Sequence, residues 1–473
     1  MNKGEKVIKG EKVIKGEKVI KGEKVIKGGK VIASGGFGCI FEPAILCQEK
    51  NIEENNTNRI SKLMTIKHAT DEFKEIEKYK NILNVIPNYD NYFLLNNFQL
   101  CKPVKLTSYD LKGFQKKCKP LKKKGINVKN INESLDKVMS INMPNGGIDV
   151  DNFIEKYFTS NDIIKLNNSL IELLIKGIVP MNKLNVYHCD IKDANVLVQI
   201  NETMLKTRLI DWGLSFLYNK KHNGIPRKLY RRPFQFNVPF SSILFNKDFI
   251  QLYNNFLEVN INPDYYQIRE FVINYIFIWN DIRGPGHLSA INNIIKKLTI
   301  KDLTAIKKNR IKEHFIEYDF TYYYIIEYLS KVLEKYTNNG TFNLMIYFEN
   351  VFLKNIDIWG FTMIYIVLYE YLYTSFDELN HNQMEFISKI KYIIIHFLYE
   401  TPTTPIDISS LVKELTNLNK VIEMFDIEET SKKITYFSTL EDNIGGFIKT
   451  KKITKSKTSK LKRNVKHKTR KRR

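Results

Sequence analysis

The pattern of apolar residues in this chain changes near Asp151, and that change limits the folds open to it. Before Asp151, short apolar runs predict a strand, a glycine turn and a strand over 31–41, a strand ending at Leu63 and another over 138–141. After it, apolar residues recur at helical spacing, as in the stripe Leu166, Leu170, Leu173 and Leu174. We therefore expect an α+β fold of two lobes, one small and β-rich and one large and mainly helical, with a cleft between them.

Three further segments complete the expected organisation. A helix is predicted from Asp71 to Leu83, with Thr70 or Asp71 as its N-cap. Lys-rich residues 101–135 form an expected insertion, and Met143–Gly147 form a turn. The small lobe is predicted over 26–147 and the large lobe over 148–430, with a long helical insertion over 241–350.

Most of the positive charge lies at the two ends of the chain. Residues 449–473 carry 14 Lys or Arg and no acid, and residues 1–30 carry 10 Lys against 4 Glu, so only +3 of the formal +23 belongs to the middle. Copies of GEKVIK over 1–25 and the tail over 431–473 are both predicted to be disordered. A phosphate-directed, non-specific contact of the tail with nucleic acid, or a nuclear-targeting role, is an alternative of equal weight.

Cysteine usage and hydropathy indicate the compartment. Five cysteines form no C-x-x-C pair and are odd in number, which argues against disulfides and favours a reducing compartment. No stretch of about 18 uncharged apolar residues occurs, and the nearest, Phe361 to Tyr369, ends at Glu370 and is typical of a buried helix. We expect an intracellular, cytoplasmic protein without a membrane span.

The segment His188–Val198, HCDIKDANVLV, spaces three polar residues as phosphoryl transfer requires. Asp190 is placed to orient and deprotonate a hydroxyl, Lys192 to neutralise the moving phosphoryl group, and Asn195 to bind magnesium. Sixteen residues after Asn195, Asp211 follows an apolar run and precedes Trp212-Gly213, an arrangement that presents a second metal ligand at a cleft.

Upstream residues supply candidates for holding the phosphates. Ala33–Gly38 is a glycine-rich loop whose backbone N–H groups can approach phosphate oxygens, although a glycine-rich hairpin turn is also structurally ordinary. Lys62 lies on the third predicted strand and could bind the α- and β-phosphates. A carboxylate on the following helix would hold Lys62 in place, and the sequence does not choose between Glu72 and Glu75.

In these motifs and their order, residues 26–417 resemble the eukaryotic-type protein kinase superfamily, and the composition is most similar to serine/threonine kinases of large DNA viruses. The resemblance implies ATP and Mg²⁺ as cofactors and a protein substrate. It implies that Ile141 is the gatekeeper, that Asn142 to Pro144 form the adenine-binding hinge, and that Asp357 starts the central helix of the large lobe. The implied nucleotide contacts are Ile32, Ala33, Ser34, Gly35, Gly36, Phe37, Gly38, Cys39, Ile40, Lys62, Glu72, Glu75, Asn142 and Met143.

Several positions depart from the family pattern. Ala33 replaces the first loop glycine, and Trp212 replaces a phenylalanine. Cys189 stands where regulated kinases carry an arginine that binds a phosphorylated activation loop, and residues 216–240 contain no Ser or Thr. We therefore expect activity without activation-loop phosphorylation. Val238-Pro239-Phe240 lacks the glutamate of the usual Ala-Pro-Glu, and its partner arginine is absent near Thr404-Pro405.

Three functions remain as hypotheses. The first is a serine/threonine kinase, favoured over a tyrosine kinase because Lys192 stands two residues after Asp190. The second is a nucleotide-binding pseudokinase that scaffolds a partner. The third is a phosphotransferase acting on small molecules, which the glycine loop with Phe37 and Lys192 disfavours. The physiological substrate does not follow from the sequence.

Overall fold

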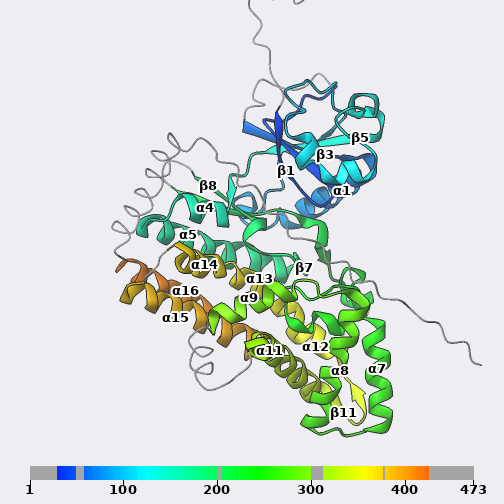
Figure 1. Ribbon diagram of the computed structural model, residues 1–473, viewed down its shortest axis with the longest axis vertical. Helices are drawn as coiled ribbons and strands as arrows, with labels where there is room; N and C mark the ends of the chain where they lie inside the picture. Colours follow the sequence, from blue (N-terminus) through cyan, green and yellow to red (C-terminus); the bar gives the residue numbers. More distant parts are fainter. Residues whose placement is uncertain are drawn as a thin grey trace, which may run out of the picture.

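An antiparallel sheet of five strands and a larger helical body make up the part of the chain that the computed structural model describes (Figure 1). The described residues are 29–48, 58–200, 204–222, 224–299, 313–375 and 379–425. The fold is a mixed α+β fold, as the sequence predicts. The repeats predicted over 1–25 and the tail predicted over 431–473 lie outside the described residues.

The sheet has the order β1-β2-β3-β5-β4. Its strands are β1 (Lys30–Ser34), β2 (Gly38–Glu42), β3 (Arg59–Thr65), β4 (Gln99–Cys101) and β5 (Val138–Pro144). The strands predicted around the glycine turn, at Leu63 and over 138–141 are confirmed. β5 is longer than predicted because Met143 and Pro144 continue the ladder opposite Ile60 and Arg59, which delays the turn expected from Met143.

Helix α1 (Ile66–Leu83) packs on one face of this sheet. It buries Ala69, Ile76, Tyr79 and Leu83. The helix begins five residues before the predicted start at Asp71, because β3 passes into it directly and Thr65, in an extended conformation, is the N-cap. The predicted N-caps Thr70 and Asp71 therefore lie inside the first turns.

The Lys-rich insertion predicted over 101–135 covers the other face of the sheet. Successive strand residues point to opposite faces, and Leu63 packs with the insertion while Met64 packs with Ala69 on the α1 side. Helices α2 (Phe114–Lys117) and α3 (Lys119–Lys123) and two 3₁₀ turns, Ile131–Glu133 and Leu135–Lys137, build this cover. Its buried side chains are Leu106, Phe114, Cys118, Leu121, Ile126 and Ile131.

Two disulfides join this cover and its neighbouring loop to the sheet, so the expectation that the cysteines stay unpaired is wrong. Cys39 bonds to Cys118 and Cys47 bonds to Cys101, and among the five only Cys189 is free. The pairs are 79 and 54 residues apart in sequence, so no local spacing marks them, and they meet only because the insertion folds back on the sheet. The reducing compartment inferred from unpaired cysteines loses its support.

The helical body begins with β6 (Ile148–Asp149), which pairs with β8. Helices α4 (Val150–Lys156), α5 (Ser160–Glu172) and α6 (Val179–Lys183) follow, with a π-helical segment, Leu173–Ile178, between the last two. The predicted stripe of leucines on α5 and this segment is buried. The connecting strands are β7 (Val186–Tyr187), β8 (Val196–Ile200), β9 (Leu205–Leu209) and β10 (Phe216–Leu217), with 3₁₀ turns at Asp193–Asn195 and Trp212–Leu214.

The predicted stretch 241–350 is largely helical where it is described. Its elements are the 3₁₀ segment Phe240–Leu244, α7 (Lys247–Val259), α8 (Tyr265–Arg283), α9 (Leu288–Leu298), α11 (Glu313–Tyr336), the hairpin β11 (Thr337–Asn338) and β12 (Thr341–Phe342), and α12 (Leu344–Tyr347). Helices α7 and α8 lie at the end of the molecule remote from the sheet (Figure 1).

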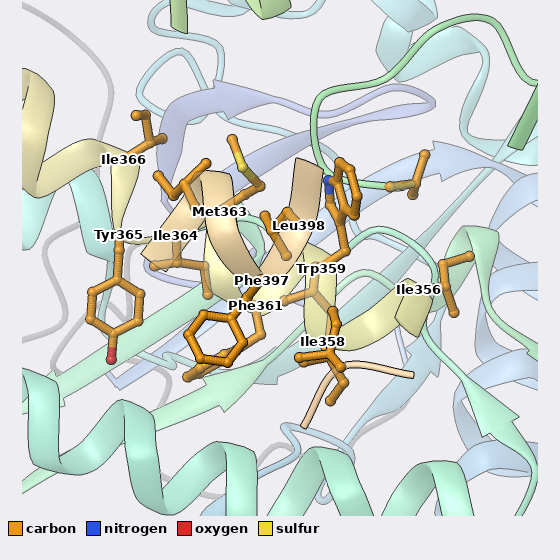
Figure 2. Close-up of a cluster of buried hydrophobic side chains, with 14 of the residues drawn as sticks. Ile356, Ile358, Trp359, Phe361, Met363, Ile364, Tyr365, Ile366, Phe397 and Leu398 are labelled. Atoms are coloured by element: carbon orange, nitrogen blue, oxygen red, sulfur yellow. The ribbon is translucent and has the colours of Figure 1, made fainter. Parts of the chain in front are cut away.

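A continuous helical stretch over Leu344–Ser375 runs through the core of the body. It comprises α12, the π-helical Phe348–Phe352, α13 (Leu353–Met363) and α14 (Ile366–Ser375). By length and composition it could cross a membrane, but 94% of its most apolar window is buried inside the protein. Side chains of α13 share this core with Phe397 and Leu398, from the segment between α15 (His381–Ile394) and α16 (Ile408–Ile422) (Figure 2).

Asp357 lies inside this stretch, and the expectation that it starts the helix is wrong. The helix begins earlier, at Leu344, because apolar residues before Asp357 extend the buried face. The Asp357 side chain is fully buried at the middle of α13.

An aromatic cluster surrounds Phe240, which ends the sequence Val238-Pro239-Phe240. Phe240 is buried and its ring lies 5.2 to 5.6 Å from the rings of Tyr328, Trp359 and Tyr399. Tyr399 precedes the loop around Thr404-Pro405, where the sequence lacks the partner arginine. These ring contacts join the segment Phe240–Leu244 to α11 and α13 without any ionised group.

Substituting Phe240 tests how much this cluster contributes. Phe240→Ala should lower the free energy of unfolding by about 3 to 5 kcal/mol, because it removes a buried ring from three aromatic neighbours. Phe277→Ala is the control, since Phe277 is 54% exposed and should cost less than about 1 kcal/mol. Urea unfolding followed by circular dichroism measures both, and equal losses for the two variants would contradict the assigned role.

Candidate active site

A cavity of about 420 Å³ lies between the sheet and the helical body. Of the predicted site residues, Ile32, Ala33, Ser34, Gly35, Ile40, Lys62, Glu72, Glu75, Met143, Asn195 and Asp211 line it. Its apolar walls come from both regions and include Ile60, Leu94, Phe98, Ile148, Leu197 and Ile210. The predicted site residues of the two regions thus meet in one space.

The glycine-rich loop closes one side of the cavity. The Gly35 N–H donates to the Gly38 carbonyl at 3.0 Å, which makes the turn between β1 and β2 tight. Gly38 cannot carry a side chain, because a Cβ there would lie 2.6 Å from the Leu63 carbonyl oxygen. Phe37 at the tip is 58% exposed and stacks on His68 of α1, with ring centroids 4.5 Å apart.

Two of the predicted nucleotide contacts face away from the cavity. Cys39 is fully buried on the insertion side, where it bonds to Cys118. Asn142 is buried within the sheet, where its amide oxygen accepts from Ser61 and Ser140. Because β5 lies between β3 and β4, the backbone of Asn142 belongs to the sheet rather than to the cavity wall.

Near the predicted hinge, the cavity wall is formed by Met143 and by residues that follow Pro144. Ile141, the expected gatekeeper, is buried against Met64 and Ala69 and does not line the cavity. Met143 lines it, followed by Gly147 and then Ile148 and Asp149. Of the predicted hinge residues Asn142 to Pro144, Met143 lines the cavity, and all three belong to β5.

Lys62 pairs with Glu72, which decides between the two candidate carboxylates. The Lys62 Nζ lies 2.6 and 2.7 Å from the two Glu72 oxygens. Glu75, three residues further along α1, instead accepts from Lys228 at 2.6 Å. Glu72 thus holds the Lys62 ammonium at the cavity, and Glu75 connects α1 to the segment after Asp211.

Asp190 lies at the centre of a hydrogen-bonded network beside the cavity. Its Oδ1 accepts from the Asn237 amide at 2.8 Å, and its Oδ2 accepts from Lys192 Nζ and from the Asn195 amide, both at 3.0 Å. Burial would raise the pKa of Asp190, but the Asn237 hydrogen bond and the charge of Lys192 lower it below its ordinary value. Asp190 is therefore a carboxylate with fixed oxygens at neutral pH.

Asn195 and Asp211 both line the cavity, and each side chain carries an oxygen of the kind that Mg²⁺ prefers as a ligand. The Asn195 amide nitrogen donates to Asp190, so its carbonyl oxygen stays free for a metal. Asp211 adopts a left-handed conformation with φ of 64°, uncommon outside glycine and a sign of functional constraint. Among the described residues, no group of three or more His, Cys, Asp and Glu could hold a metal.

Asp357 fixes the backbone before Asp190. Its two oxygens accept from the His188 and Cys189 N–H groups at 2.9 and 2.7 Å, and Asn182 donates to the same carboxylate at 2.7 Å. Cys189 has a positive φ of 62°, an unfavourable conformation that these bonds maintain. Arg232 donates to the Cys189 carbonyl at 2.6 Å from the other side.

Trp212 joins α1 to the loop before Asp190, and the sequence did not indicate this contact. Its ring lies 5.2 Å from Tyr79, 5.7 Å from Phe93 and 5.0 Å from His188. The His188 Nε2 lies 2.9 Å from the Ile210 carbonyl oxygen, so the segments that carry Asn195 and Asp211 are also connected directly. The larger ring in place of phenylalanine therefore packs without displacing Asp211 from the cavity.

The segment after Asp211 is held to α1 by Lys228. Besides pairing with Glu75, the Lys228 ammonium donates to the carbonyl oxygens of Ser215 and Gly213 at 2.9 and 3.2 Å. The Tyr79 hydroxyl also donates to the Ser215 carbonyl at 2.7 Å. The Lys228 ammonium, which belongs to the segment itself, thus connects the segment to α1.

Sequence reasoning missed Asn237, Lys228 and the cavity residues Ile148 and Asp149. Asn237 lies 47 residues from Asp190, and Lys228 lies 153 residues from Glu75. No spacing in the sequence connects partners this far apart. Asp149 could have been noticed, because it caps α4 by accepting from the Asn152 N–H at 2.9 Å, a frequent role for an aspartate before a helix.

No family model matches the sequence, and no curated protein is significantly similar to it.

The Lys228 contact can be tested independently of any activity. Lys228→Met should accelerate amide exchange in residues 213–232 by about fivefold, because it removes a partly buried ion pair worth about 1 kcal/mol. Lys220→Met is the control, since Lys220 is exposed and makes no ion pair among the described residues. Hydrogen–deuterium exchange measured by mass spectrometry reports both, and unchanged exchange in Lys228→Met would contradict the contact.

Proposed function

We propose that this chain is a serine/threonine protein kinase of two lobes, in which the sheet with α1 forms the small lobe and the helical body the large one. The observation that carries the proposal is the meeting of Lys62, Asn195 and Asp211 at one cavity, with Asp190 and Lys192 beside it. Phosphoryl transfer needs held phosphates, placed metal ions and an oriented hydroxyl, and these residues can supply each.

Each residue has a distinct part in the proposed reaction. Lys62, held by Glu72, binds phosphate oxygens of ATP, and Mg²⁺ on Asn195 and Asp211 would neutralise negative charge on the phosphates. Asp190 accepts a hydrogen bond from the acceptor hydroxyl and takes its proton as the oxygen attacks the γ-phosphorus, while the bond from the γ-phosphorus to the β,γ-bridging oxygen breaks and ADP leaves. Lys192, 3.0 Å from Asp190, stabilises the charge on the phosphoryl group in transit.

The fixed charges around Asp190 suit this role. Its lowered pKa keeps it ionised, and its two oxygens have separate partners, so the carboxylate cannot rotate freely. Asn195 donates to Asp190 while offering its own oxygen to the cavity, which couples the position of the base to that of the metal. This coupling favours an active enzyme over a nucleotide-binding scaffold, because a scaffold does not require it.

Replacing Asp190 tests the proposed reaction. Asp190→Asn should lower transfer from γ-labelled ATP to Ser/Thr protein substrates by about a hundredfold to ten-thousandfold, because the general base is lost. Nucleotide binding should persist, because Lys62, Asn195 and Asp211 remain. Asp136→Asn, an exposed change in the insertion, is the control.

Three outcomes would contradict the proposal. Wild-type protein that binds ATP but transfers nothing would be a pseudokinase scaffold. Labelling of aminoglycosides or choline without any protein would indicate a phosphotransferase for small molecules. Equal transfer by wild type and Asp190→Asn would remove Asp190 from the reaction.

We also propose that the kinase is active without phosphorylation of the segment after Asp211. Lys228 already connects this segment to α1, and the Tyr218 hydroxyl is committed to Glu349 at 2.6 Å on a side chain that is 5% exposed. Cys189, which is fully buried, stands at the position where regulated kinases carry an arginine that binds the phosphorylated activation loop.

Phosphatase treatment tests this second proposal. The treated protein should keep the transfer rate of the untreated protein within about twofold, because Lys228 makes the contact that a phosphate would otherwise create. Mass spectrometry of the purified protein establishes whether any phosphate was present beforehand. Loss of transfer after treatment, restored by preincubation with ATP, would show that the segment does need phosphate.

A further inference from the structure

The segment after Asp211 is strongly basic. Between Asp211 and Asp248 the sequence has no Asp or Glu, and it has Lys or Arg at Lys220, Lys221, Arg227, Lys228, Arg231, Arg232 and Lys247. Lys228 is committed to Glu75. The arginines of this segment have no carboxylate within ion-pair distance among the described residues, so their charge is not compensated within the molecule.

The basic part of this segment lies against the loop that carries Asp190. Arg232 donates to the Cys189 carbonyl at 2.6 Å, and Asn237 donates to Asp190 at 2.8 Å. Arg227 and Arg231 are exposed. Because Arg231 directly precedes Arg232, which contacts the residue before Asp190, the exposed charge adjoins the proposed site of phosphoryl transfer.

The turn between α8 and α9 adds a third exposed arginine to this surface. Arg283, the last residue of α8, donates to the Arg231 carbonyl at 2.6 Å, and the His287 N–H donates to the Phe234 carbonyl at 2.7 Å. The His287 ring stacks on Phe236 with centroids 5.6 Å apart. A Cβ on Gly286 would lie 2.5 Å from the Phe234 carbonyl oxygen, so the turn packs closely on the segment. The turn between α8 and α9, which is part of the predicted insertion 241–350, thus packs on the segment that contacts the loop carrying Asp190.

The electrostatic environment of this surface is positive. Arg232 is 5% exposed, it donates only to carbonyl oxygens, and its Nη2 has no hydrogen-bond partner among the described residues. A buried guanidinium without a counter-ion is unfavourable and leaves its charge uncompensated. The pKa of His287 is lowered by burial and then by Lys192. Asp281 lies two residues before Arg283 on α8, and residues at that spacing do not face each other on a helix.

Negative charge lies on another side of the site. Asp149 and Asp151 belong to β6 and α4, and Asp193 follows the Asp190 loop. The pKa of Asp193 is raised by burial and by the charges of Asp151 and Asp149. These carboxylates would repel an acidic residue that bound near them, whereas the surface of Arg227, Arg231 and Arg283 would attract it.

We propose that the acceptor is an acidic protein segment, with Asp or Glu on the side of the phosphorylated Ser or Thr that faces Arg227, Arg231 and Arg283. This inference rests on the proposed function and adds the class of substrate to it. Carboxylates of the substrate supply the counter-charge that these arginines lack, and they orient the segment so that its hydroxyl approaches Asp190. Acidic residues on the other side of the phosphorylated Ser or Thr would approach Asp149 and Asp151, which repel them, and would not strengthen binding of the substrate.

A peptide panel with the full-length protein and γ-labelled ATP tests the inference. The peptides carry one Ser with three Glu, three Arg or three Ala, placed either before or after it. We expect the Glu peptide of one orientation to exceed the Ala peptide by about tenfold in kcat/KM, and the Arg peptide of that orientation to fall below it. The preference should weaken as salt is raised from 0.05 to about 0.5 M, because exposed charges are screened.

Charge reversal assigns the preference to these arginines. In the double variant Arg231→Glu and Arg283→Glu, the ratio of kcat/KM for Glu and Arg peptides should invert, mainly through KM. Lys413→Glu, on the exposed side of α16, reverses one charge elsewhere and should leave the ratio unchanged. A peptide with phosphoserine in place of Glu distinguishes the anion, and a preference for phosphoserine alone would overturn the assignment to carboxylates.

The outcomes separate this inference from the proposed function. Labelling of all peptides without regard to charge, or a preference for Arg peptides, would overturn the acidic acceptor and leave the kinase proposal standing. A charge preference that persisted in the double variant would move the acceptor surface away from Arg231 and Arg283 and also overturn the inference. Absence of transfer to any peptide or protein would overturn the proposed function and the inference together.

Discussion

The buried carboxylate of Asp357 is the contact on which the geometry of the site depends. A carboxylate in the core is costly unless its oxygens accept hydrogen bonds, and Asp357 accepts them from two backbone N–H groups and from Asn182. These bonds hold Cys189 in its left-handed conformation and so determine the direction in which Asp190 leaves the backbone. Burial raises the pKa of Asp357, while the neighbouring His188 and the two N–H groups act in the opposite direction.

The same helix also positions the segment that would bind the acceptor. Trp359, two residues after Asp357, donates from its indole nitrogen to the Phe236 carbonyl at 2.9 Å. A Cβ on Gly360 would lie 2.5 Å from the Ile191 carbonyl oxygen, so the loop carrying Asp190 rests directly on α13. One rigid, buried helix thus sets the distance between the proposed base and the acceptor surface.

Local sequence patterns predicted the elements and the polar residues of the cavity, because each depends on a few neighbouring positions. Lys62, Asn195 and Asp211 follow from short motifs, and all three line the cavity. Patterns failed where the partner is distant in sequence. The choice of Glu72 over Glu75 depends on Lys228, and the disulfides depend on how the insertion folds back. Asn142 was misplaced because strand β5 extends further than its apolar residues indicate.

The aromatic cluster at Phe240 affects how the segment after Asp211 responds to salt, pH and temperature. An ion pair in that place would weaken with added salt and at extremes of pH, whereas the contacts of Phe240 with Tyr328, Trp359 and Tyr399 involve no ionised group. Apolar contact instead weakens on cooling, because its driving force near room temperature is mainly the entropy of water. The part of the anchoring that this cluster supplies therefore does not depend on the charge of any side chain, unlike the Lys228–Glu75 pair, and it weakens as the temperature falls.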